Sequence, residues 1–339
     1  ILGHDDPTMI KTLEELINSD AMDNKYDGVN NVFKATDIPL DDPGVMGLFA
    51  GTEVLGITPE DIDGCPLGCL GVPEFGTDFV IQMVIDTKPK TLSDLIRISG
   101  LSHGTDVWLN NAQTLIEEGK ATISTAICTR DDIMTYLINK GVESDVPEWY
   151  IWSCERIKYM FPKAHAAAYV MMAYRIAYCK INYPLAYYAA YFGIRASAFS
   201  YELMGQGKEK LLYHMKEYKR RAELNQLSKK DQDTLKDMKN VLEMYARGFD
   251  FLPIDIYKSK ASKFQIVGDK LLPPFNTIDG MGDKAAEAME IAAKDGPYLS
   301  KDDFRQRTKV SKTLVDLMAD MGLLGDLPET NQLSLFDFA

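Results

Sequence analysis

Apolar residues recur every three or four positions through most of the first two hundred residues of the chain. Such groups lie at 79–84, 92–98 and 133–138, with polar residues between them. This period places the apolar side chains on one face of an α-helix. It predicts amphipathic helices joined by short turns from about residue 45 to residue 201. The stretch 19–45 is rich in Asp, Asn, Gly and Pro, which predicts a long loop with little regular structure.

The pattern changes in the last third of the chain. Residues 202–248 predict long polar helices and form the most basic stretch of the sequence. Residues 249–275 carry short apolar runs broken by Gly-Asp, which predict a small extended or hairpin element. Two helical units follow at 276–294 and 300–323. The sequence therefore predicts a mainly α fold with a small β element.

Composition sets the broad class of the protein. The 339 residues are 46% hydrophobic and 26% charged, which suits a globular chain of two or three domains. The longest apolar stretch is far shorter than the ~20 residues of a membrane helix. Five scattered cysteines are typical of reduced thiols, so we expect a soluble cytoplasmic protein. The net charge of −13 argues against a small free-standing DNA-binding protein, although a larger assembly can still carry one basic face.

The first candidate site is the Ala-rich segment 161–169. Pro162 predicts a helix start, and Lys163 lies at the helix N-terminus, where the backbone dipole favours anions. His165 and Tyr169 are four residues apart and therefore share one helix face. A cation, an imidazole and an aromatic ring in this arrangement suit a nucleoside triphosphate. The alternative is a buried Ala-rich helix with incidental polar residues.

The segment Lys163–Tyr169 resembles the nucleotide-binding motif in the fingers domain of bacterial C-family replicative DNA polymerases. Other short segments of the sequence resemble the Gram-positive PolC branch of that family, and they are spread over nearly the whole chain. These segments are Gly71–Thr77, Gly100–Trp108, Arg130–Met134, Asp145–Tyr150 and Tyr159–Phe161.

The resemblance implies roles for individual residues. Arg130 and Lys163 would face the triphosphate of an incoming deoxynucleoside triphosphate (dNTP), and His165 would lie beside them. Tyr169 would lie near the base or sugar. Ser102, His103 and Gly104 would line the nascent base pair.

The resemblance also places the catalytic metal site outside this chain. In the family, palm-domain aspartates hold Mg²⁺ with the dNTP, and one of them directly precedes the Ile-Leu-Gly that forms residues 1–3 here. We therefore expect no catalytic and no metal-binding residue in this chain, which should bind nucleotide without polymerising it. Asp5 is better explained as the cap of a helix that begins at Asp5-Asp6-Pro7. Relatives also carry a further basic segment where residues 143 and 144 adjoin.

A second candidate site is Ile278-Asp279-Gly280-Met281-Gly282, an apolar-x-Gly-x-Gly turn before a predicted helix. It resembles the hairpin of a helix-hairpin-helix motif, in which glycines let backbone N–H groups approach a DNA phosphate without sequence preference. Residues 311–323 are a possible second, degenerate unit. Lys219 and Arg220 in the basic stretch would add salt-dependent contacts. The alternatives are a simple helix cap and a solvated helix face.

The polar C-terminal tail ends in a short apolar motif, Gln332-Leu333-Ser334-Leu335-Phe336. A Gln followed by spaced Leu, Leu and Phe suits a peptide that binds an apolar pocket. It resembles the sliding-clamp binding pentapeptide of bacteria. The alternative is a tail that packs on its own domain.

Together these features predict part of a DNA-directed DNA polymerase, whose partners are primer-template DNA, dNTP, the bacterial sliding clamp and other replisome subunits. The expected parts are the end of a palm domain (1–24), a multi-helix fingers domain (25–200), a duplex-binding domain with a helix-hairpin-helix (201–328) and a clamp-binding tail (329–339). A non-enzymatic DNA-binding or repair protein recruited by the clamp remains the alternative.

Overall fold

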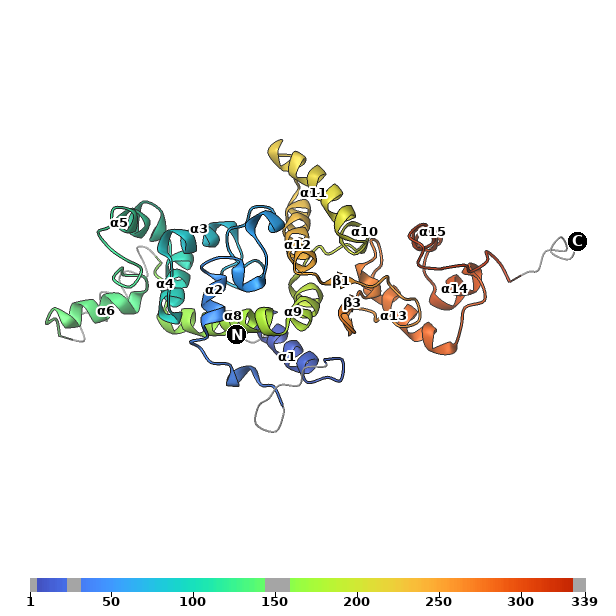
Figure 1. Ribbon diagram of the computed structural model, residues 1–339, viewed down its shortest axis with the longest axis horizontal. Helices are drawn as coiled ribbons and strands as arrows, with labels where there is room; N and C mark the ends of the chain where they lie inside the picture. Colours follow the sequence, from blue (N-terminus) through green and yellow to red (C-terminus); the bar gives the residue numbers. More distant parts are fainter. Residues whose placement is uncertain (1–4, 23–31, 144–158, 332–339) are drawn as a thin grey trace, which may run out of the picture. The chain divides into compact units, whose positions relative to one another are not determined.

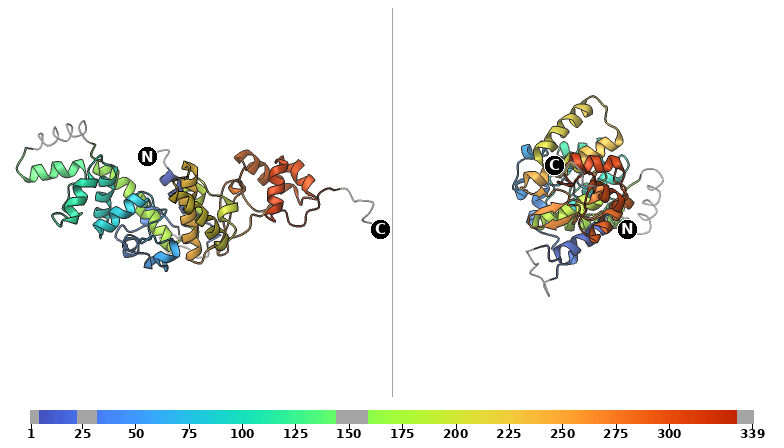
Figure 2. Two further views of the ribbon diagram at one scale, coloured as in Figure 1. Left: turned by 90° about the horizontal axis from the view of Figure 1, so that it is seen from above. Right: turned by 90° about the vertical axis from the view of Figure 1, so that its right-hand side faces the viewer.

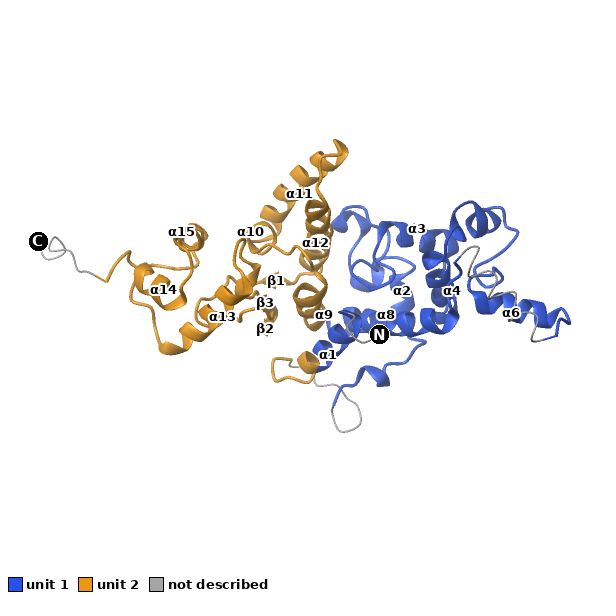
Figure 3. Ribbon diagram, turned by 180° about the vertical axis from the view of Figure 1, so that it is seen from behind, with its two compact units in different colours: residues 1–14, 26–184 blue, residues 15–25, 185–339 orange. Residues whose placement is uncertain are grey.

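The computed structural model describes residues 5–22, 32–143 and 159–331, and the chain in these ranges is mainly α-helical, as predicted (Figure 1). It divides into two compact units (Figure 3). Unit 1 comprises residues 1–14 and 26–184, and unit 2 comprises residues 15–25 and 185–339.

Unit 1 is built from helices whose starts are capped by short polar side chains. The Thr91 hydroxyl accepts a hydrogen bond from the N–H of Asp94 in the first turn of the following helix, and the Asp94 and Asp132 carboxylates accept from the N–H groups of Thr91 and Thr129. The helices of this unit are α1 (Asp5–Ile17, which extends past its boundary), α2 (Pro43–Leu48), α3 (Asp78–Thr87), α4 (Leu92–His103), α5 (Gln113–Glu117), α6 (Arg130–Asn139) and α8 (Lys163–Asn182). The predicted helices at 79–84, 92–98 and 133–138 are confirmed as α3, α4 and α6.

The long helix α8 forms the centre of unit 1. It packs against α4 and α2 and buries Ala166, Val170 and Ala173. Pro162 precedes its first residue, which confirms the predicted start. Near its other end Lys180 is fully buried, and its ammonium group donates hydrogen bonds to the carbonyl oxygens of Gly68 (2.8 Å) and Leu70 (2.5 Å).

Unit 2 combines a helical hairpin with a small sheet. Figure 2 shows α11 and α12, which pack against each other. The sheet has the order β1-β3-β2, with β1 parallel to β3 and β2 antiparallel to it, so the predicted small β element is confirmed. The elements are α9 (Pro184–Ala190), α10 (Tyr201–Met204), α11 (Lys208–Glu223), α12 (Lys229–Ala246), β1 (Asp250–Phe251), β2 (Gln265–Val267), β3 (Lys270–Leu272), α13 (Asp283–Ala292), α14 (Lys301–Thr308) and α15 (Lys312–Asp320).

The predicted helical unit at 300–323 is confirmed and consists of two helices, α14 and α15. Lys309 ends α14 in the left-handed conformation (φ 59°), and Ser311 then caps α15. A residue with positive φ cannot continue a right-handed helix. The chain therefore reverses at 309–311.

Within unit 2, polar side chains are buried where α12 packs against residues 188–198. The Tyr188 hydroxyl donates to the Glu243 carboxylate (2.6 Å), and the Asp237 carboxylate accepts a hydrogen bond from the N–H of Ala198 (2.8 Å). Asp237 is only 1% exposed. Burial raises the pKa of this carboxyl group to about 6, because the charged form loses its hydration.

This pKa predicts an unusual pH dependence of stability for Asp237→Asn. The unfolded carboxyl group ionises near its ordinary pKa of 3.8 and the folded one only near 6, so ionisation favours the unfolded chain. The contribution of protonated Asp237 to the free energy of unfolding is fully present below pH 3.8 and is lost as pH rises through 6. Asn does not ionise, so the variant does not lose this stability. Its free energy of unfolding should rise relative to that of the wild type by up to about 3 kcal/mol between pH 4 and pH 7.5.

Urea unfolding of both proteins at several pH values measures this difference. Asp233→Asn on the same helix is the control, since its carboxylate is partly exposed and pairs with Lys229. A gap between wild type and Asp237→Asn that stays constant with pH would contradict the prediction.

Candidate nucleotide and nucleic-acid site

Four aromatic and imidazole rings form a row on the surface of unit 1. Phe161 lies between His103, the last residue of α4 (ring centroids 4.8 Å apart), and His165 in the first turn of α8 (5.1 Å). Tyr169 follows His165 at 4.6 Å. The His165–Tyr169 pair follows from their spacing of four residues on α8. The packing of α4 on α8 adds His103, which lies more than sixty residues away in the sequence.

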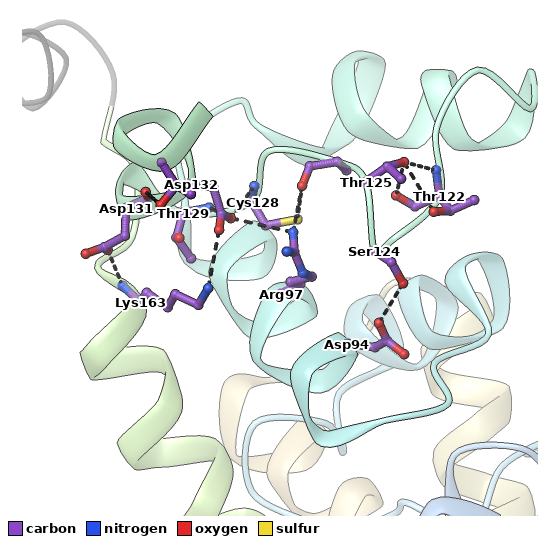
Figure 4. A network of polar contacts seen from close by, with 12 residues as sticks. Asp94, Arg97, Thr122, Ser124, Thr125, Cys128, Thr129, Asp131, Asp132 and Lys163 are labelled. Atoms are coloured by element: carbon purple, nitrogen blue, oxygen red, sulfur yellow. Dashed lines mark hydrogen bonds and ion pairs between the residues drawn. The ribbon is translucent and has the colours of Figure 1, made fainter. Parts of the chain in front are cut away.

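A second group of side chains surrounds Asp132 at the start of α6 (Figure 4). The Lys163 ammonium lies 3.5 Å from one carboxylate oxygen of Asp132, and the Arg97 guanidinium lies 3.8 Å from the other. The N–H of Lys163 donates to Asp131 (2.7 Å), which ties the first residue of α8 to α6. The Lys163 side chain is 46% exposed. It is therefore accessible to an anionic ligand even though it already has a carboxylate partner.

Asp132 is held in its charged form. Burial by itself raises the pKa of its carboxyl group, but hydrogen bonds from the N–H groups of Thr129 and Cys128 and the charges of Arg97 and Lys163 outweigh this effect, so that its pKa lies below the usual value. The carboxylate thus caps α6 and also carries the counter-charge of Lys163. An anion that binds Lys163 must compete with this carboxylate.

The predicted nucleotide-binding residue Arg130 is the first residue of α6. Its N–H donates to the carbonyl oxygen of Phe161 (3.3 Å), which joins α6 to the segment before α8. Gly100 on α4 lies against the same corner, because a Cβ atom there would stand 2.7 Å from Cγ2 of Thr129. A side chain at this position would push α6 away from α4.

Ser102, His103 and Gly104 form the end of α4. The Ser102 hydroxyl donates to the carbonyl oxygen of Ser99 (3.0 Å). A Cβ atom on Gly104 would lie 2.4 Å from Cγ2 of Val107, so only glycine fits between α4 and the following turn. Of the residues predicted to bind nucleotide, the structure brings His103, His165 and Tyr169 into one row and places Lys163 and Arg130 at the adjoining start of α8 and α6.

Sequence reasoning assigned no role to two residues that organise this site, Asp132 and Phe161, although Phe161 lay within the candidate segment 161–169. Asp132 was detectable, since Thr129-x-x-Asp132 before an apolar run is the sequence signature of a capping box. The contact of Phe161 with His103 had no such signal, because it depends on the packing of distant segments.

The predicted DNA-binding turn lies before α13 in unit 2. Gly280 has φ 82°, in the region that glycine tolerates, and Gly282 precedes the first residue of α13. Apart from its own chain neighbours, no described residue has a heavy atom within 4 Å of the position that a Cβ on Gly282 would occupy. The Met281 side chain is 7% exposed and belongs to the core of the unit, and its N–H donates to the carbonyl oxygen of Ile278 (3.0 Å).

The two arginines of α11 are paired with acidic neighbours. The Arg220 guanidinium donates two hydrogen bonds to Glu217 (3.0 and 2.8 Å), and Arg221 pairs with Asp231 (2.6 Å). Lys219 lies on the same helix. These pairs leave α11 with less available positive charge than its sequence indicates.

Neither a membrane-spanning helix nor a metal cluster occurs in the described part of the chain. Within residues 5–22, 32–143 and 159–331, no helix is both long and apolar enough to cross a membrane. In the same ranges, no three His, Cys, Asp or Glu side chains come together in a way that would hold a metal ion. The predicted clamp-binding residues 332–336 lie outside the described residues.

Comparison with known proteins shows the family. The model of the bacterial DNA polymerase III alpha subunit finger domain matches residues 6–142, and that of a helix-hairpin-helix motif matches residues 248–333. The chain is 48% identical to the PolC-type DNA polymerase III of Streptococcus sanguinis (strain SK36) and to that of Streptococcus pneumoniae (serotype 2, strain D39), and 47% identical to that of Streptococcus pyogenes (serotype M5).

Each of these alignments covers 99% of this chain and 24% of the relative, so the chain spans about a quarter of the length of the curated relatives it matches. The alignments run over 370 positions, more than the 339 residues of this chain. The relatives therefore carry additional residues inside the matched region. On this evidence the chain belongs to the PolC-type DNA polymerase III family and comprises its finger-domain and helix-hairpin-helix regions.

Proposed function

We propose that this chain supplies the nucleotide-binding and duplex-binding surfaces of a DNA-directed DNA polymerase. Unit 1 would bind the incoming dNTP through Arg130, Lys163, His165 and Tyr169, next to Ser102, His103 and Gly104. Unit 2 would bind primer-template DNA. The observation that carries this proposal is the row His103–Phe161–His165–Tyr169 beside the Lys163 ammonium.

The row and the cation suit the two ends of a nucleotide. Aromatic and imidazole rings offer flat faces to a base or sugar, while an exposed ammonium group attracts phosphate. Lys163 is also the first residue of α8, where unpaired N–H groups and the helix dipole favour an anion. The triphosphate would replace Asp132 as the partner of Lys163, and α8 would carry both parts of the binding site.

The part of the chain that the structure describes offers no group of residues that would hold Mg²⁺. The described carboxylates form no group that fits a metal site, and Asp132 is already committed to its helix cap and to two cations. We therefore assign no reaction step to the metal here. The role of this chain is to bind and orient the nucleotide and the duplex.

The turn at Ile278–Gly282 supports duplex binding through its backbone. Space beside Gly282 is open, and the start of α13 offers N–H groups to a phosphate. Lys219 and Arg220 would add a charge contribution, which Glu217 reduces for Arg220. The tail residues Gln332–Phe336 would tether the polymerase to the sliding clamp and so raise its effective concentration on DNA.

Replacement of Lys163 by Met should weaken dNTP binding by roughly 10- to 100-fold, since a hydrogen bond to a charged group contributes about 1.5–3 kcal/mol. Met keeps most of the apolar stem and removes only the charge. Fluorescence titration of the chain with a labelled dNTP measures the change. Lys120→Met is the control, because Lys120 is exposed in the same unit and pairs with Glu118. Equal affinity for wild type and Lys163→Met would contradict the proposal.

Replacement of Gly282 by Asp should weaken binding of a DNA duplex about 5- to 10-fold at low salt, with a smaller effect as salt rises. The new carboxylate meets no steric obstacle and would repel phosphate. Gly282→Asn is the matched control, since it has the same shape without the charge and both residues are good helix caps. If Asp and Asn variants bind duplex equally well, phosphate does not approach this turn.

Replacement of Leu335 or Phe336 by Ala should abolish measurable binding of the chain to a bacterial sliding clamp, because each would remove an anchor from the apolar pocket. Surface plasmon resonance on immobilised clamp measures this. Phe338→Ala, in the same tail but outside the pentapeptide, should bind like the wild type. Unchanged binding by both motif variants would exclude the pentapeptide as the tether.

A further inference from the structure

We propose that Glu74 is a positioning residue, whose carboxylate fixes the His103 ring in the aromatic row and so sets how the nucleobase is stacked. This inference rests on the proposed function, since it adds a residue to the same nucleotide site. Glu74 itself would touch neither base nor phosphate. It would act through His103.

The backbone of Glu74 is the first observation. Its φ of 68° lies in the left-handed region, which is costly for a residue with a Cβ atom. The turn 71–76 also contains Gly71 (φ 71°) and Gly76, where a Cβ atom would stand 2.9 Å from the backbone nitrogen of Gly71. Glycines thus fill the demanding positions on both sides. A glutamate that keeps a strained conformation between them points to a role for its side chain.

The contacts of Glu74 are the second observation. Its Oε2 atom accepts a hydrogen bond from the Ser99 hydroxyl (3.3 Å) and lies 3.4 Å from Nε2 of His103. Ser99 and His103 are one turn apart on α4, so one carboxylate oxygen bridges them. The other ring nitrogen, Nδ1, lies 2.9 Å from the carbonyl oxygen of Ser99. Because a carbonyl can only accept, Nδ1 is the donor of this bond. With Nδ1 as a donor, Nε2 can donate to the Glu74 carboxylate only when the ring is protonated, and the imidazolium form is then held from both sides.

The turn that carries Glu74 is firmly anchored. Phe75 is buried and its ring meets Phe49 edge to face, with centroids 5.0 Å apart. Its carbonyl oxygen accepts from the Cys69 thiol (3.5 Å), and the preceding loop is held by Lys180 through Gly68 and Leu70. The Glu74 side chain is only 14% exposed. The carboxylate is therefore a fixed reference for His103, whose ring is 40% exposed and faces Phe161.

Two variants of the full chain test this inference. Glu74→Gln removes the charge at nearly constant shape. Glu74→Gly removes the side chain but suits the left-handed backbone, so it should melt at the same temperature as the wild type or higher. Both should weaken dNTP binding about 5- to 20-fold. Binding of inorganic tripolyphosphate, which has no base to stack, should not change. Glu60→Gln, an exposed glutamate of the same unit, is the control.

The ring of His103 gives an independent readout. Its ¹H–¹³C NMR signals, assigned with His103→Gln, should shift in both Glu74 variants and stay in place in the control. Unmoved His103 signals, unchanged dNTP affinity, or an equal loss for dNTP and tripolyphosphate would each overturn the inference. The variant Lys163→Met distinguishes failure of this inference from failure of the proposed function. If it weakens dNTP binding and the Glu74 variants do not, the inference fails and the proposed function stands. If Lys163→Met has no effect, the proposed function fails.

Discussion

The burial of Lys180 is the constraint on which unit 1 depends. An ammonium group without water is costly unless its hydrogens find acceptors, and here the carbonyl oxygens of Gly68 and Leu70 provide them. The bonds join the end of α8 to the loop that leads to Glu74. Since α8 begins with Lys163 and carries His165 and Tyr169, one helix both presents the candidate nucleotide-binding residues and holds the loop that positions His103.

The other end of α8 has its own fixed point in Asp132. Its carboxylate closes the cap of α6 and pairs with Arg97 from α4 and Lys163 from α8, so three helices meet at one charge. Such a network is stable only while each charge has a partner. A triphosphate that takes Lys163 from Asp132 still leaves Arg97 and two backbone N–H groups with the carboxylate. The corner can thus exchange one partner without exposing an unpaired buried charge.

Local patterns predicted much of this molecule, and long-range packing accounts for what they missed. Helices α3, α4 and α6 follow from the spacing of apolar residues, and the His165–Tyr169 pair follows from a separation of four residues. The contact of His103 with Phe161 joins segments far apart in sequence, and no local pattern encodes it. The positive φ of Glu74 and of Lys309 also escaped prediction, because neither residue type signals a left-handed conformation.

The acidic net charge is compatible with DNA binding because unit 2 would bind phosphate mainly through backbone N–H groups. In unit 2 the glycine turn offers N–H groups, which need no cationic side chain to meet a phosphate. The cations of α11 instead neutralise neighbouring acids, as Arg220 does with Glu217 and Arg221 with Asp231. Exposed pairs of this kind exchange partners at little cost, because water and salt screen the attraction between their charges. Phosphate groups of a duplex would therefore compete with these carboxylates, and the net charge of the chain is a poor guide to its partners.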